Sequence, residues 1–181
     1  MSDFLDIYLD KTTRFGDVVR TVPADSWTAH SPCEKWTAAD VLDHVVDTQR
    51  DFFARHHLEL GERPAGSPEQ VWQAHVEGAR RLLGDGSVLT RTFDGFFGPT
   101  TIGATLVDFY ALDLVVHRWD LARSVGSDTE FSEAEMDMMD KGITLFGEHM
   151  YDDGVFAPAV PPPPDATRQE RLLAVMGRHP R

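Results

Sequence analysis

The sequence predicts an all-α protein, an up-and-down bundle of four principal helices with a short extra helical segment near the C-terminus. Apolar residues recur at spacings of three and four along most of the chain, which is typical of helices that bury one face. Capping signals precede several of these stretches, and only residues 87–100 have a strand-like composition. The length of 181 residues suits one domain, residues 1–181, with its own core.

The first helix is predicted from Asp3 to Val22 on its apolar periodicity, and Pro23 ends it. Residues 23–36 form a loop that we expect to fold over one end of the bundle. The second helix is predicted from about Ala38 to Leu60, because a cap residue and an acid three residues later directly precede its apolar pattern.

A third helix is predicted from Pro68 to Leu83, since Ser67 followed by proline is a typical helix start and Gly84 a typical stop. Residues 87–100 then mix β-branched and aromatic residues with Asp-Gly and Gly-Pro turn signals. This segment is either a short hairpin or an extended connection.

The fourth helix is predicted from about Ile102 to Val125, with Gly126 as its C-terminal cap. Another helix opens at Ser132 and lasts to about Met150. Four consecutive prolines follow and should lie extended on the surface. The chain then forms a short amphipathic turn through Leu172, Leu173 and Met176.

The charge pattern excludes several kinds of partner. The formal net charge is −13 and no basic cluster occurs, so neither nucleic acid nor an anionic membrane surface is expected to bind. No apolar run approaches the roughly 20 residues that span a bilayer, and the N-terminus lacks the pattern of a targeting segment. The lone Cys33 excludes an internal disulfide. We therefore expect a cytoplasmic protein.

Three side chains are candidate ligands of one divalent metal. Asp113 and His117 lie four residues apart on the most apolar helix, so they share one face. His44 lies on the apolar face of the second helix. Burying such groups without a partner costs several kcal/mol, and either a hydrogen-bonding network or a shared cation would compensate them. Metal sites of helical bundles are commonly built from facing helices in this way.

Three motifs resemble a known family: Pro32-Cys33-x-x-Trp36, His44 within VLDHVV, and the segment DLVVHRWDLARSVG. Together they resemble the DinB-like metalloenzymes, in the branch allied to the metal-binding domain of mycothiol-dependent maleylpyruvate isomerase. The resemblance implies a four-helix bundle that binds a divalent metal through His44, Asp113 and His117, although the isomerase usually carries Glu where Asp113 stands. It also implies a role in the chemistry of low-molecular-weight thiols.

A site with three protein ligands keeps a coordination position open, as catalytic metal sites do. We expect a transferase in which the metal lowers the pKa of a mycothiol-like thiol for attack on an electrophilic small molecule. Zinc is the first choice, and nickel, manganese or iron also suit this ligand set. A bundle that binds metal or a small ligand without catalysis, or a metal-dependent isomerase or hydrolase, are the alternatives. The oligomeric state stays open, a homodimer included.

The remaining polar residues carry weaker expectations. Asp120, one turn beyond His117, either accepts a hydrogen bond from that imidazole or pairs with an arginine. Cys33 is read as a small buried hydrophobe and the acidic residues of 128–140 as a solvated face. Packing, structural or solvated roles are expected for the other conspicuous aromatic residues and histidines: Trp36, Trp119, His56, His57, His75 and His149.

Overall fold

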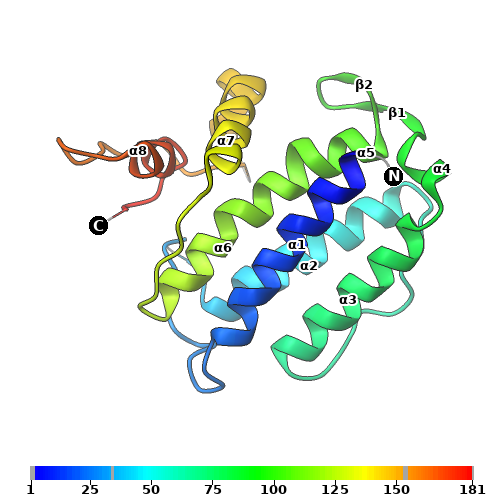
Figure 1. The fold of residues 1–181 in the computed structure, drawn as a ribbon, viewed down its shortest axis with the longest axis horizontal. Helices are drawn as coiled ribbons and strands as arrows, with labels where there is room; N and C mark the ends of the chain where they lie inside the picture. The colour runs from blue at the N-terminus through cyan, green and yellow to red at the C-terminus, as the bar shows by residue number, and fades with distance from the viewer. Residues whose placement is uncertain (1–2, 34, 153–154, 181) are drawn as a thin grey trace.

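A computed structural model describes residues 3–33, 35–152 and 155–180 of the chain. Its helices α1, α2, α3 and α6 form a bundle in which α1 and α2 each pack against both α3 and α6 (Figure 1). The predicted all-α bundle is therefore confirmed. The elements in chain order are α1 (Asp3–Thr21), α2 (Ala38–Arg55), α3 (Pro68–Leu83), α4 (Gly86–Leu89), β1 (Thr92–Gly95), β2 (Gly98–Thr101), α5 (Ile102–Thr105), the π-helix η1 (Leu106–Ala111), α6 (Leu112–Ser124), α7 (Glu133–Phe146), the 3₁₀-helix η2 (Gly147–Tyr151) and α8 (Arg168–Val175).

Helix α2 begins as predicted and ends earlier. The hydroxyl of Thr37 accepts a hydrogen bond from the backbone N–H of Asp40, and the Asp40 carboxylate accepts one from the Thr37 N–H, at 3.3 and 2.8 Å. The helix stops at Arg55, not near Leu60, because His57 adopts a left-handed backbone with φ of 56°. Leu58, which follows the helix, is buried in the core. The apolar pattern of the sequence therefore extends beyond the last helical residue.

The helix predicted for 102–125 is continuous but changes type twice, as α5, η1 and α6 follow one another directly. Periodicity in the sequence did not reveal the π-helical turn, since it alters the register without altering the composition. Before it, β1 and β2 pair as an antiparallel hairpin whose turn carries Phe96 and Phe97. This settles the alternatives for 87–100 in favour of a hairpin, except that Gly86–Leu89 is helical.

Helix α6 is buried on both sides. Leu114 and Leu121 face the bundle core, whereas Leu112 and Trp119 belong to a second apolar cluster with residues of α7 and α8. Figure 1 shows α7 and α8 beyond α6, on the side away from α3. We call residues 127–152 and 155–180 the C-terminal unit. The apolar character of α6 all round therefore reflects two cores that share one helix.

The helices of the C-terminal unit differ from their predicted bounds. The predicted helix 132–150 is an α-helix only to Phe146, because Gly147 adopts a positive φ of 52° and a 3₁₀ turn follows. The predicted amphipathic turn through 172–176 is a complete helix, α8. Within the described residues, no helix is both long enough and apolar enough to cross a membrane.

A buried ion pair joins α6 to α7. The Arg118 guanidinium donates two hydrogen bonds to the Glu135 carboxylate, at 2.8 and 3.2 Å, and Lys11 of α1 lies 3.5 Å from the same carboxylate. Glu135 is fully buried, so the reading of 128–140 as a solvated face is wrong at this residue. The pair fixes the C-terminal unit against the bundle.

The core of the bundle contains a second buried polar group, formed by Tyr8, Gln49 and His75. The amide oxygen of Gln49 accepts hydrogen bonds from the Tyr8 hydroxyl at 2.5 Å and from His75 Nε2 at 3.0 Å. Burial lowers the pKa of His75 to about 4. This histidine is therefore structural, as expected from the sequence.

Replacing Arg118 should destabilise the protein strongly, because it leaves the Glu135 carboxylate buried with too few donors. Arg118→Met should lower the free energy of unfolding by about 3–5 kcal/mol in urea denaturation. Arg168→Met is the matched control, since Arg168 pairs with exposed carboxylates of α7 and its replacement should cost far less. Equal losses in the two variants would contradict the role given to the buried pair.

His75 should make the fold sensitive to mild acid. Between the ordinary pKa of 6.5 and about 4, the unfolded chain binds a proton that folded His75 excludes. Its contribution is complete above pH 6.5 and is lost as the pH falls through this window, by up to about 3 kcal/mol. Urea unfolding of wild type and His75→Phe at several pH values should show a flatter profile for the variant. Parallel profiles would refute this assignment.

Candidate metal centre

A cavity of about 980 Å³ lies between the bundle and the C-terminal unit and contains the three predicted ligands. Almost half of its lining comes from the C-terminal unit, which sequence reasoning did not connect with the site. The lining residues are Pro32, Cys33, Lys35, Trp36, His44, Thr48, Phe96, Phe109, Tyr110, Leu112, Asp113, His117, Phe146, His149, Val155, Phe156, Ala157, Pro158, Val160, Gly177, Arg178 and His179.

The side chains of His44, Asp113 and His117 converge on one point of this cavity. The Oδ1 atom of Asp113 lies 3.5 Å from Nε2 of His44 and 3.3 Å from Nε2 of His117, and the three possible ligand atoms lie within 4.8 Å of one another. His44 and Asp113 are not core residues, because 26% and 27% of their side chains are exposed to the cavity. His117 is buried, with 6% exposed.

Opposite charges hold this group together. Burial alone would raise the pKa of the Asp113 carboxyl, but His117 and then His44 outweigh it and lower the pKa well below its usual range. Burial likewise opposes the charged form of His117, yet the carboxylates around it raise the pKa of its imidazole well above the usual value. The carboxylates thus favour the protonated, positively charged form of His117.

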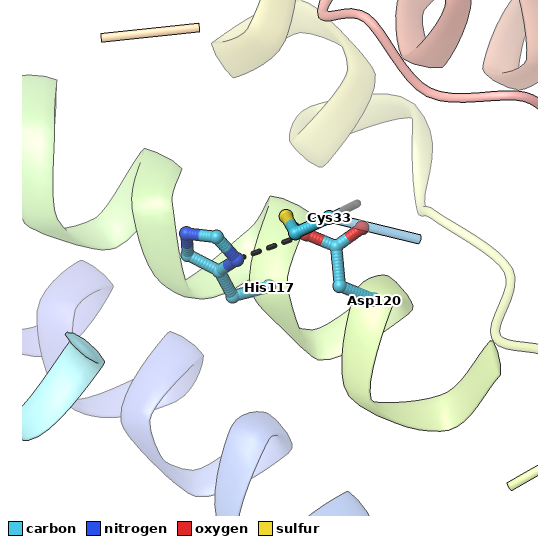
Figure 2. Close-up of side chains that lie close together, drawn as sticks. All are labelled: Cys33, His117 and Asp120. Carbon is cyan, nitrogen blue, oxygen red and sulfur yellow. Dashed lines mark hydrogen bonds and ion pairs between the residues drawn. The ribbon is translucent and has the colours of Figure 1, made fainter. Parts of the chain in front are cut away.

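Asp120 lies beside His117, next to its Nδ1 atom, and fixes the direction of its ring (Figure 2). Its Oδ2 atom is 2.9 Å from His117 Nδ1 and accepts a hydrogen bond at 2.8 Å from Arg178, so both contacts expected as alternatives occur together. Burial opposes ionisation, but the Arg178 guanidinium and His117 lower the pKa of Asp120 to about 2. An imidazole that donates from Nδ1 presents Nε2 to the cavity.

Arg178 reaches Asp120 because the chain turns sharply after α8. Gly177 adopts a φ of 79°, and a Cβ atom there would lie 2.7 Å from the Cβ of Ala157, so the turn requires glycine. The Arg178 backbone N–H then donates to the Leu173 carbonyl at 2.9 Å. Its guanidinium is buried and donates to the Met176 carbonyl at 2.7 Å.

Cys33 and Trp36 bring the loop of residues 23–36 to the site. Cys33 is half-buried, not a core hydrophobe as expected, and its Sγ atom lies 3.2 Å from Arg178 and 3.3 Å from Asp120. Figure 2 shows Cys33 close to Asp120 and His117. The Trp36 ring packs on the ring of His44, with 4.6 Å between their centroids, and lies 5.6 Å from that of His117. Trp36 therefore packs as predicted, but against the candidate ligands.

The chemistry of the donors fits a divalent cation at His44, Asp113 and His117. Two imidazole nitrogens and a carboxylate oxygen suit zinc and the neighbouring transition metals. Among the described residues, the buried Oδ2 of Asp113 has no hydrogen-bond partner, which leaves this oxygen available to a cation. Cys33, His117 and Asp120 also lie within 4.8 Å of one another, but the Arg178 guanidinium beside them would repel a metal. The ligand assignment stays a prediction that this geometry supports.

The fold and the site define the class of the protein, a helical bundle with a candidate metal centre between two of its helices. The chain belongs to the mycothiol maleylpyruvate isomerase N-terminal domain family of DinB-like metal-binding domains, whose model matches residues 8–122. The resemblance noted in the sequence is therefore confirmed. Because the match ends within α6, Arg178 and the C-terminal unit lie beyond the matched residues.

Two uncharacterized proteins of Mycobacterium tuberculosis are similar to nearly the whole chain. They are MT0763 of strain CDC 1551 / Oshkosh and Rv0738 of strain ATCC 25618 / H37Rv, and each is 27% identical over 168 residues, which cover 91% of either chain. No solved structure gives a significant match. The likeness to the two relatives extends past the domain that the family model covers.

Asp120 should tune metal affinity through His117. Asp120→Asn removes the charge that holds the imidazole and should weaken Zn²⁺ binding about 10- to 100-fold, measured by competition with a chromophoric chelator at fixed pH. Asp128→Asn is the matched control. Asp128 accepts a hydrogen bond at 3.1 Å from Trp119 of α6, the helix that carries His117, but does not touch the three candidate ligands. Unchanged affinity in a folded Asp120→Asn variant would contradict this role.

Proposed function

We propose that the protein is a metal-dependent transferase that activates a mycothiol-like low-molecular-weight thiol for attack on an electrophilic small molecule. The observation that carries the proposal is the convergence of His44, Asp113 and His117 on one point of a large cavity. Membership of a family named for a mycothiol-dependent enzyme supports the choice of thiol. The thiol and the electrophile are the proposed partners.

Each residue of the site has a distinct task in this proposal. His44, Asp113 and His117 hold the cation, which supplies a positive charge that favours the deprotonated form of a thiol. Asp120 and Arg178 hold the His117 ring in place, and Trp36 packs against the ring of His44. Three protein ligands leave room for a thiol sulfur beside them.

The reaction joins the two small molecules inside the cavity. The thiol sulfur forms a bond to the electrophilic carbon with its electron pair, and the thiol proton passes to solvent. The bond from that carbon to its leaving group breaks, and the leaving group takes the electron pair of that bond and departs as an anion or, after protonation by solvent, as a neutral molecule. At about 980 Å³, the cavity is at the upper end of the range for small-molecule sites and can hold both reactants. Binding of both reactants in one cavity would hold the reacting atoms close together.

Zinc is the proposed metal, because the reaction needs charge stabilisation and no change of oxidation state. The same donors also accept nickel, manganese or iron, so elemental analysis of the purified protein identifies the occupant. A folded protein that binds metal and thiol but transfers the thiol to no electrophile would favour the alternative of a binding bundle without catalysis.

Removal of one candidate ligand should abolish tight metal binding and thiol transfer together. His44→Ala should lower the metal stoichiometry well below that of wild type, since two remaining ligands hold a cation poorly. The measurement is metal content after dialysis, followed by thiol transfer in the metal-loaded protein. Cys33→Ser is the control and should keep most of both, because the proposed nucleophile is the added thiol. Full metal occupancy in His44→Ala would refute the site.

A further inference from the structure

Five phenylalanine rings form a continuous apolar surface beside the candidate metal centre. Neighbouring rings in this group lie 4.8 to 6.1 Å apart between centroids, and four of the five line the cavity directly. We call this group the phenylalanine wall. It consists of Phe96 and Phe97 from the hairpin turn, Phe109 from η1, Phe146 from α7 and Phe156 from the segment after η2.

The wall begins close to the candidate ligands. Phe109 precedes Asp113 by four residues in one continuous helical segment, so about one turn separates an apolar ring from the carboxylate. Leu112 and Tyr110 line the same cavity between them. A small molecule with its reactive atom at the metal centre would therefore extend its remaining atoms along the wall.

Folding does not account for all of these rings. Phe96 is 70% exposed and Phe97 40% exposed, whereas Phe109, Phe146 and Phe156 are only partly buried. Removal of apolar surface from water stabilises by roughly 25 cal/mol for each Å² buried. A ligand that covers these exposed rings would therefore gain this free energy on binding. The exposure of these rings is thus typical of a binding surface and not of a core.

The charges of the cavity narrow the ligand further. Among the described lining residues Asp113 is the only carboxylate, although the chain carries 30 acidic residues, and a bound divalent cation would offset its charge. Lys35, Arg178 and four histidines also line the cavity. This balance disfavours a cationic ligand.

We infer that the electrophile which this site accepts carries an aromatic ring and no positive charge, and that the phenylalanine wall holds this ring while the reactive atom lies at the metal centre. That the ligand is an electrophile rests on the proposed function, whereas its aromatic ring is inferred from the phenylalanine wall alone. Edge-to-face and offset contacts with Phe96 and Phe156 would orient the ring.

A binding experiment without any reaction tests the inference. Acetophenone and acetone share a carbonyl group and differ in the ring, and their affinities for the zinc-loaded protein can be compared by protein NMR titration. Acetophenone should bind at least about tenfold more tightly. Phe96→Ala and Phe156→Ala should each reduce this preference severalfold. Phe4→Ala is the control, because Phe4 is 40% exposed on α1 and does not line the cavity.

Thiol transfer to styrene oxide and propylene oxide gives a second measurement, since the two epoxides again differ only in the ring. A higher kcat/KM for styrene oxide that falls in Phe96→Ala supports the inference. If neither epoxide reacts while acetophenone still binds through the wall, the proposed transfer fails and the ring site stands. Equal or undetectable binding of the two ketones, or a preference that survives both phenylalanine substitutions, overturns the inference whether or not thiol transfer occurs.

Discussion

The Asp120 carboxylate is fully removed from water, and the structure supplies its donors from distant parts of the chain. His117 comes from the same helix, Arg178 from the turn after α8, and the thiol of Cys33 from the loop before α2. A buried carboxylate without such partners would cost several kcal/mol, so the loop and the C-terminal unit must dock together. The direction of the His117 ring depends on that docking.

Helix α6 packs against a different apolar cluster on each of its two sides. On the bundle side, His44 of α2 lies close to Asp113 and His117 of α6. The other side carries α7 and α8, which supply Arg178 and part of the phenylalanine wall. The buried pair of Arg118 and Glu135 joins α6 to α7, so α6 connects the candidate ligands Asp113 and His117 with the part of the cavity that the C-terminal unit lines.

Sequence reasoning predicted the parts of the site that depend on local patterns. The cap at Thr37 and the four-residue spacing of Asp113 and His117 are short-range signals, and both features occur in the structure. The contact of Arg178 with Asp120 joins residues 58 positions apart, so no periodic pattern in the sequence indicates it. The phenylalanine wall likewise contains rings from several segments of the chain, and local sequence patterns do not predict that these segments lie together.

The π-helical turn Leu106–Ala111 bears on how such a site could arise. A π turn corresponds to one extra residue in an α-helix, and each residue of an α-helix rotates the chain by about 100°. Loss of a single residue here would keep Asp113 and His117 in step with each other but rotate Phe109 and Tyr110 relative to them. Insertion or deletion of one codon would therefore reshape the phenylalanine wall next to an unchanged pair of candidate ligands, which gives this fold a short evolutionary route to cavities of different shape.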